Sequence, residues 1–102
     1  METALLKSSL NDVIRKLRDM LVKQGFLIEI FDEQKKTVMA FRDGNWYRTP
    51  RHILFELSAM DNAVTRIDIT ASIDGKKKNR QAEELIEEKI ASSIYTTFQF
   101  NR

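Results

Sequence analysis

The N-terminal part of the chain carries apolar residues at three- and four-residue steps, as one face of a helix does. The repeat consists of Leu6, Leu10, Val13, Ile14, Leu17, Met20 and Leu21. Gly25 follows the last apolar position, and glycine commonly ends a helix because it adopts the left-handed conformation without strain. The pattern predicts a helix over about residues 4–24, with Ser8 or Ser9 as an alternative N-cap after a frayed start.

Beyond Gly25 the apolar period changes to two, which is typical of β-strands. Four segments with this alternation cover residues 26–31, 37–42, 53–59 and 66–73. Polar turn residues such as those of Asp61-Asn62 and Asp74-Gly75 separate or end these segments. Because the connections are short, we expect neighbouring strands to pair as antiparallel hairpins.

A second amphipathic helix is predicted after Gly75. Its apolar stripe consists of Ala82, Leu85, Ile86, Ile90, Ile94 and Phe98. Asn79 is suited to cap the helix, and Glu83 and Glu84 lie in its first turns, where the helix dipole favours negative charge. Two helices with apolar stripes need an apolar sheet face to cover.

These elements define the expected fold as a single α+β domain over residues 1–102, in the order α-β-β-β-β-α. In this fold a four-stranded antiparallel meander carries both helices on one face, which gives a two-layer sandwich. This order of elements resembles that of the helix-grip domains of some bacterial envelope lipoproteins. The stretches that match are Gln24–Ile28, Thr65–Ile69 and Asp74-Gly75. The chain lacks the signal sequence and the cysteine of those lipoproteins, so no function is carried over.

One face of the predicted sheet is left without a helix, and its outward positions in the first three strands are apolar. These positions are Leu27, Phe31, Val38, Ala40 and Leu54, with Glu29, His52, Glu56 and Arg66 around them. A contiguous exposed apolar patch commonly marks an interaction surface. We therefore predict self-association through this face, with the alternative that Trp46, Tyr47 or a terminus folds over it.

The segment from Arg42 to His52 has the most unusual composition of the chain. Its candidate partner-binding residues are Arg42, Trp46, Tyr47, Arg48, Arg51 and His52, which include the only tryptophan and the only histidine. Arginines beside aromatic residues contact phosphates and stack on bases, and the same residue types dominate protein interfaces. The alternative is that Trp46 and Tyr47 pack at the edge of the core while the arginines remain solvated.

Two charged runs near the second helix are interpreted as solvated surface. An anion could bind where Lys76–Arg80 precedes a helix N-terminus, but Gly75 stands alone and no glycine-rich phosphate loop is present. The second run consists of Glu83, Glu84, Glu87 and Glu88. Its spacing places Glu84 and Glu88 on one exposed helix face, and no histidine is nearby in the sequence, so a metal site is not expected.

The composition narrows the class of protein. With no cysteine, disulfides and cysteine-ligated zinc sites are excluded, and a reducing compartment is compatible. Met1–Lys7 shows no signal-peptide pattern and no apolar run is long enough to span a membrane, so we expect a cytoplasmic protein without membrane insertion. The net charge of +2, from 17 basic and 15 acidic residues, does not by itself indicate a nucleic-acid binder.

No arrangement of residues indicates catalysis or a bound cofactor. His52 is the only histidine, and no serine lies in a nucleophile motif. We therefore expect a non-enzymatic binding module, without metal or cofactor, that forms a homodimer or binds another protein. The first alternative is a nucleic-acid-binding domain that uses the Arg42–His52 segment, and the second is a binder of a small apolar ligand between sheet and helices.

Overall fold

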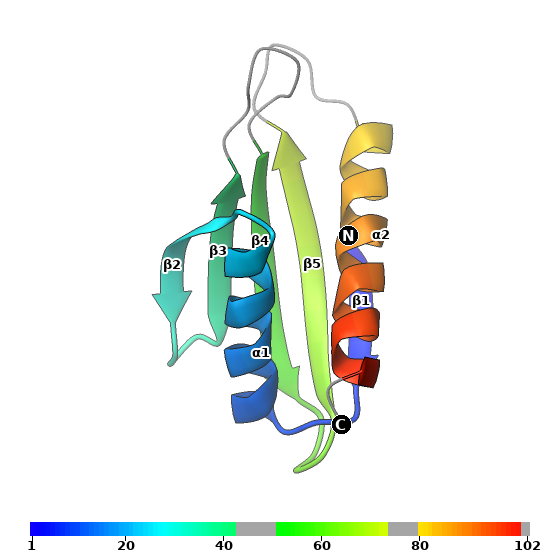
Figure 1. The fold of residues 1–102 in the computed structure, drawn as a ribbon. Coiled ribbons are helices and arrows are strands. Elements are labelled where there is room, and N and C mark those ends of the chain that lie inside the picture. The colour runs from blue at the N-terminus through cyan, green and yellow to red at the C-terminus, as the bar shows by residue number, and fades with distance from the viewer. Residues whose placement is uncertain (43–50, 74–79, 101–102) are drawn as a thin grey trace.

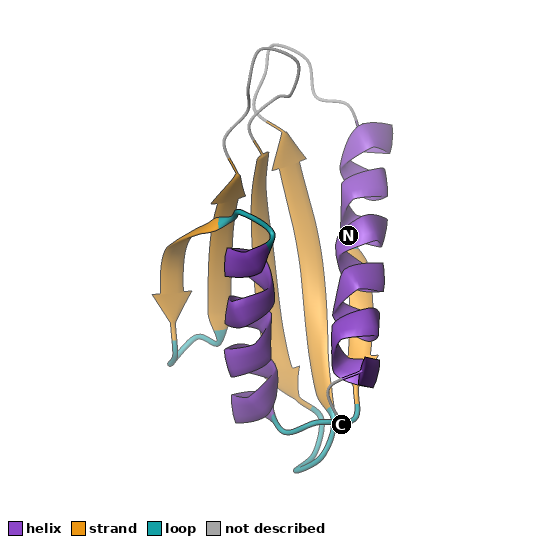
Figure 2. Cartoon of the chain, viewed as in Figure 1, coloured by secondary structure: helices purple, strands orange, loops and turns teal. Residues whose placement is uncertain are grey.

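The computed structural model describes residues 1–42, 51–73 and 80–100, apart from the side chains of residues 99 and 100. In chain order the elements are β1 (Glu2–Leu6), α1 (Leu10–Lys23), β2 (Leu27–Asp32), β3 (Thr37–Arg42), β4 (Arg51–Ala59), β5 (Thr65–Ile73) and α2 (Arg80–Phe100). They form an α+β fold in which both helices lie on one side of a five-stranded antiparallel sheet (Figure 1). Figure 2 shows the two helices in front of the strands, with α2 beside β1.

The strands follow the order β1-β5-β4-β3-β2 across the sheet, and every neighbouring pair is antiparallel. The predicted antiparallel meander is therefore confirmed as β2 to β5, in which strands consecutive in sequence are neighbours in space. A fifth strand, β1, pairs with β5 at the opposite end of the sheet from β2, and it was not predicted. The expected order α-β-β-β-β-α is thus corrected to β-α-β-β-β-β-α.

The predicted first helix begins too early, because its first residues belong to β1. Ala4 and Leu6 are buried while Thr3 and Leu5 are exposed, which is the period of a strand. Leu6 also lies four residues before Leu10, so it fits the helical repeat equally well. A short apolar segment of this kind is ambiguous by periodicity, and pairing with β5 decides its conformation.

α1 begins and ends at residues that the sequence marks. Ser9 is the N-cap, and its hydroxyl accepts a hydrogen bond from the backbone N–H of Asp12 at 3.5 Å. The buried Thr65 hydroxyl donates to the carbonyl of Ser8 at 2.9 Å, which ties the connection between β1 and α1 to the sheet. After the helix, Gly25 has a φ of 84°, so the prediction of a glycine stop is confirmed.

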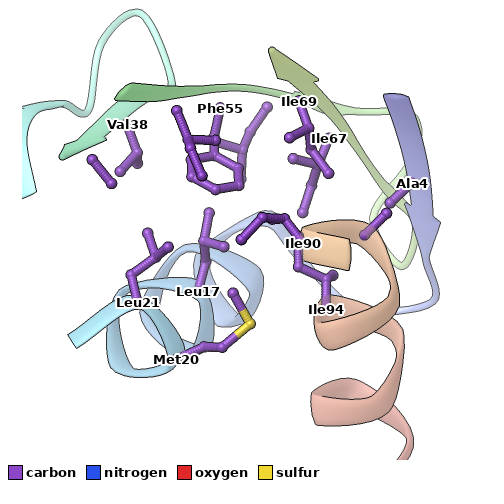
Figure 3. Close-up of a cluster of buried hydrophobic side chains, with 14 of the residues drawn as sticks. Ala4, Leu17, Met20, Leu21, Val38, Phe55, Ile67, Ile69, Ile90 and Ile94 are labelled. Atoms are coloured by element: carbon purple, nitrogen blue, oxygen red, sulfur yellow. The ribbon is translucent and has the colours of Figure 1, made fainter. Parts of the chain in front are cut away.

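The hydrophobic core lies between the sheet and the two helices (Figure 3). α1 contributes Val13, Leu17, Met20 and Leu21, α2 contributes Ile90, Ala91 and Ile94, and the sheet contributes side chains that include Phe55, Ile67 and Ile69. Fully burying one side chain of this size stabilises a fold by about 1.5–3 kcal/mol. The core therefore occupies only one face of the sheet.

Two carboxylates of α2 are buried against the end of β5. Oε2 of Glu87 accepts a hydrogen bond from the backbone N–H of Ala71 at 2.8 Å, and Oε2 of Glu83 accepts one from Ile73 at 3.2 Å. The pairing of β1 with β5 ends at Ile69, so within the described chain these carboxylates take the place of strand carbonyls. The buried N–H groups are thereby satisfied rather than left without an acceptor.

The interpretation of all four glutamates of α2 as solvated is therefore wrong for Glu83 and Glu87, which are 7% and 1% exposed. It is confirmed for Glu84 and Glu88, which are exposed. The sequence contained a signal for the difference, because Ala91 lies four residues after Glu87, on the same face of the helix. That face packs on the sheet, so Glu83 and Glu87 are buried together with the apolar residues of the same face.

Candidate interaction surface on the open sheet face

No described element covers the sheet face opposite the helices, and we refer to it as the open face. The strand register brings apolar side chains together there, since Leu27 lies opposite Phe41 and Met39 lies opposite Leu54. Ile30 of β2 also lies opposite Met39. These residues form what we call the apolar strip, which crosses β2, β3 and β4. Leu27 and Ile30 are 66% and 50% exposed, and the other members are partly exposed.

A β-bulge in β2 aims one of these side chains at the open face. Ile28 pairs with Ala40 but Ile30 pairs with Met39, so Glu29 is an extra residue on the β2 side of the ladder. Without this extra residue, strict alternation would send Ile30 to the covered face together with Ile28. The bulge therefore places Ile30 on the open face and Phe31 on the covered face.

Three residues of the predicted interaction patch lie on the covered face instead. Val38 and Ala40 are 1% and 0% exposed and lie opposite core residues of β4. Phe31 lies opposite Val38 and packs against the core. Leu27 and Leu54, the remaining members of the predicted patch, lie on the open face as expected.

The wrong assignment has two physical causes. β3 is apolar on both faces, because Met39 and Phe41 alternate with Val38 and Ala40, so alternation alone does not choose the buried side. In β2 the bulge shifts Phe31 to the covered face, and nothing in the apolar pattern announces the extra residue. The apolar pattern does not give the register of the strands. Ile30, Met39 and Phe41 were therefore not predicted to belong to the interaction patch.

His52 and Glu29 form a polar pair at the margin of the apolar strip. Nδ1 of His52 lies 2.9 Å from Oε1 of Glu29 on the same face of the sheet. The His52 ring also packs against Phe41, with 4.7 Å between the ring centroids. The pair therefore places an ionisable side chain beside the apolar strip.

A second polar cluster lies on the open face of β5 and β1. Asp68 accepts hydrogen bonds from the Thr3 hydroxyl at 2.8 Å and from Nε of Arg66 at 3.1 Å. The Thr3 hydrogen bond is the main cause that lowers the pKa of Asp68 below its usual value, and Arg66 adds to it although partial burial opposes the shift. The open face thus carries an apolar strip on β2, β3 and β4 and a polar cluster on β5 and β1, and Leu5 of β1 is exposed opposite Arg66.

The sheet separates the residues that were predicted to bind a partner. His52 lies on the open face, whereas Arg42 and Arg51 lie opposite each other at the end of the covered face. The guanidinium carbon of Arg42 is 5.8 Å from the centroid of the Phe26 ring. Trp46, Tyr47 and Arg48 lie outside the described residues, as does the run of lysines at 76–78. The described members of this set, Arg42, Arg51 and His52, therefore do not share one face of the sheet.

Within the part of the chain that the structure describes, no group of His, Asp and Glu side chains is arranged to hold a metal ion. No helix among those described is long and apolar enough to cross a membrane. No protein-family model matches the sequence, and no curated protein is significantly similar to it. A functional assignment therefore depends on the geometry and chemistry of the molecule's own surfaces.

Proposed function

We propose that the chain is a small non-enzymatic binding module that self-associates through its open face. The observation that carries the proposal is the apolar strip, whose members Leu27 and Ile30 are at least half exposed in a single chain. Removing apolar surface from water favours association by roughly 25 cal/mol for each Å² that is buried. Two copies that meet through their strips would shield this surface from water.

Contact through the face is favoured over strand pairing along the edge of β2. β2 is the last strand of the sheet, so its outer edge has no strand partner among the described residues. However, the bulge at Glu29 interrupts the regular row of backbone groups that a pairing strand would need. Natural sheets use bulges and charged residues at their edges to prevent such pairing. The side chains of Leu27 and Ile30 remain accessible on the face.

The charges around the apolar strip suit a second copy of the same chain. In a two-fold dimer the same patch lies on both partners, so it must complement itself. The open face carries the acids Glu29, Glu56 and Asp68 and the bases His52 and Arg66. A face with charges of one sign would repel its copy, whereas this mixture allows opposite charges to meet across the interface.

Insertion of charge into the apolar strip tests the proposal. Leu54→Asp and Leu27→Asp each place a carboxylate where the second copy would exclude water, which penalises association. We expect the unmodified chain to show twice the monomer mass of 11.9 kDa in size-exclusion chromatography with light scattering. Both variants should show the monomer mass, and their circular dichroism should match that of the unmodified chain.

Leu85→Asp is the matched control, because Leu85 is 58% exposed on α2 and lies away from the open face. This variant introduces the same charge and should keep the dimer mass. A monomer mass for the unmodified chain over a wide range of protein concentrations would contradict the proposal. Dimers in both strip variants would also contradict it, because the strip would then lie outside the interface.

A further inference from the structure

Two adjoining hollows on the helix side of the molecule carry an excess of basic residues. The larger, of about 530 Å³, lies between α1 and the end of α2, and the smaller, of about 220 Å³, lies between α2 and the end of the sheet. Gln24 borders both, so we treat them together as the basic groove. Its basic side chains are Arg15, Lys16 and Lys23 in the larger hollow and Arg42, Arg51 and Lys89 in the smaller one.

The basic groove concentrates a charge that the chain as a whole does not have. The net charge of the full sequence is only +2. Among the described residues that line the two hollows, Asp19 is the only acid. One of the basic residues, Arg15, is also paired with Asp12 at 3.1 Å. Basic side chains thus outnumber acids among the described residues of a concave surface, which focuses the electrostatic field on an incoming anion.

Aromatic rings position two of these cations. Nζ of Lys16 lies 5.3 Å from the centroid of the Phe98 ring, and the guanidinium carbon of Arg42 lies 5.8 Å from that of Phe26. Cation–π contacts of this kind hold a charge in place while it keeps its capacity to bind an anion. A ligand would therefore lose less free energy to the ordering of these side chains.

Arg42 and Arg51 bring two positive charges together beside the smaller hollow. The two arginines lie directly opposite each other on β3 and β4. A phosphate group bound beside them would accept charge-assisted hydrogen bonds from their guanidinium groups.

The shape of the groove fits an extended anion better than a single ion. Arg15 and Lys23 are eight residues apart on α1, which corresponds to about 12 Å along the helix axis. Lys89 and the two arginines extend the positive charge beyond the end of α1. The positive charge is therefore spread along the groove rather than gathered at one point.

We propose that the basic groove binds the phosphodiester backbone of a single-stranded nucleic acid. Such a strand presents a regular row of negative charges, and cationic grooves in other proteins follow this backbone without reading its sequence. In the described part of the groove, Phe26 and Ile90 are buried, at 4% and 6% exposed, and offer little surface for stacking bases. Recognition is therefore electrostatic, independent of sequence and sensitive to salt.

An acidic protein segment is less well suited to the groove. Protein partners derive most of their affinity from apolar and aromatic anchors in pockets. The larger hollow is lined mainly by charged and polar side chains, with Met20 as its one apolar residue among those described, and Met20 is buried. A phosphate backbone needs no apolar anchor, since the basic side chains supply the interaction.

This proposal is independent of self-association, because the basic groove and the open face lie on opposite sides of the sheet. A dimer formed through the open faces would present one groove on each outer side. Failure of either proposal would therefore leave the other intact, and the two are measured by different signals.

Binding of a fluorescein-labelled oligothymidylate, followed by fluorescence anisotropy at low salt, tests the proposal. The double variant Lys23→Glu/Lys89→Glu reverses two charges in the groove, and both side chains are exposed, so the fold should be unaffected. We expect its affinity to be at least about tenfold weaker than that of the unmodified chain. The slope of log affinity against log salt should fall by about 1.4, which corresponds to about 0.7 for each lost phosphate contact.

The double variant Lys7→Glu/Lys35→Glu is the matched control, because it makes the same change in net charge at exposed lysines outside the groove. It should bind nearly as tightly as the unmodified chain. Absence of binding by the unmodified chain at low salt would overturn the proposal, as would an equal loss of affinity in the control. Displacement by polyglutamate as effective as that by unlabelled strand would also overturn it, in favour of an acidic protein partner.

Discussion

Successive side chains of β4 alternate between two environments, the core beneath the helices and the open face. Ile53, Phe55 and Leu57 are at most 4% exposed beneath the helices, whereas Leu54 and Glu56 between them point to the open face. The covered side chains are shielded from water within one chain, so they stabilise the fold. Leu54 belongs to a strip that one chain leaves accessible. Apolar residues on the same strand therefore stabilise the fold on one face, while on the other they belong to the surface through which we propose that the chain self-associates.

The largest effect should come from Phe55, which is fully buried on the covered face. Phe55→Ala should lower the free energy of unfolding by about 3–5 kcal/mol, because it removes buried contacts and leaves a cavity. Leu54→Ala, one residue away on the open face, should cost about 1 kcal/mol or less. Urea denaturation followed by circular dichroism, at a concentration where the chain is monomeric, measures both. Equal losses would contradict the assignment of the two faces.

A smaller loss of stability is expected when a polar contact between α2 and the covered face of the sheet is removed. Glu87→Leu removes the acceptor for the backbone N–H of Ala71 and leaves that buried donor unsatisfied, which costs about 1–3 kcal/mol. Glu88→Leu, at an exposed position of the same helix, should change stability by less than about 0.5 kcal/mol. Hydrogen exchange at the Ala71 amide should accelerate only in the first variant. Unchanged exchange in both would exclude a stabilising role for the contact.

Much of the fold was predictable because long segments carry a strong period. The helical stripe that ends before Gly25 and the alternation from Ile67 to Ile73 each match an observed element. β1 was not predictable in the same way, because Ala4 and Leu6 give too short a pattern and their conformation depends on pairing with β5. Local periodicity determines the long elements, while contacts distant in sequence determine the short one.

The candidate surfaces were predictable only in part, because each depends on which side of the sheet a residue faces. Arg42 and His52 were grouped by sequence, yet the pleat places them on opposite faces. Conversely, Lys23 and Lys89 are far apart in sequence, yet they line adjoining hollows on the helix side of the molecule. Alternation within one strand separates neighbours, and tertiary packing assembles a surface from distant segments.

The smallest effect on stability is expected from Asp68, in the polar cluster of the open face. The Thr3 hydrogen bond and the Arg66 charge lower the folded-state pKa of Asp68 below its usual value of 3.8. The stabilisation from Asp68 is therefore complete above that value and is lost as the pH falls through the lower, folded-state pKa. Asp68→Asn should lose stability less steeply than the unmodified chain below about pH 4, as measured by urea denaturation at a series of pH values. The exposed-site variant Asp19→Asn controls for the removal of one carboxylate. An acid profile of Asp68→Asn identical to that of the unmodified chain would mean that the contacts of Asp68 with Thr3 and Arg66 do not stabilise the fold.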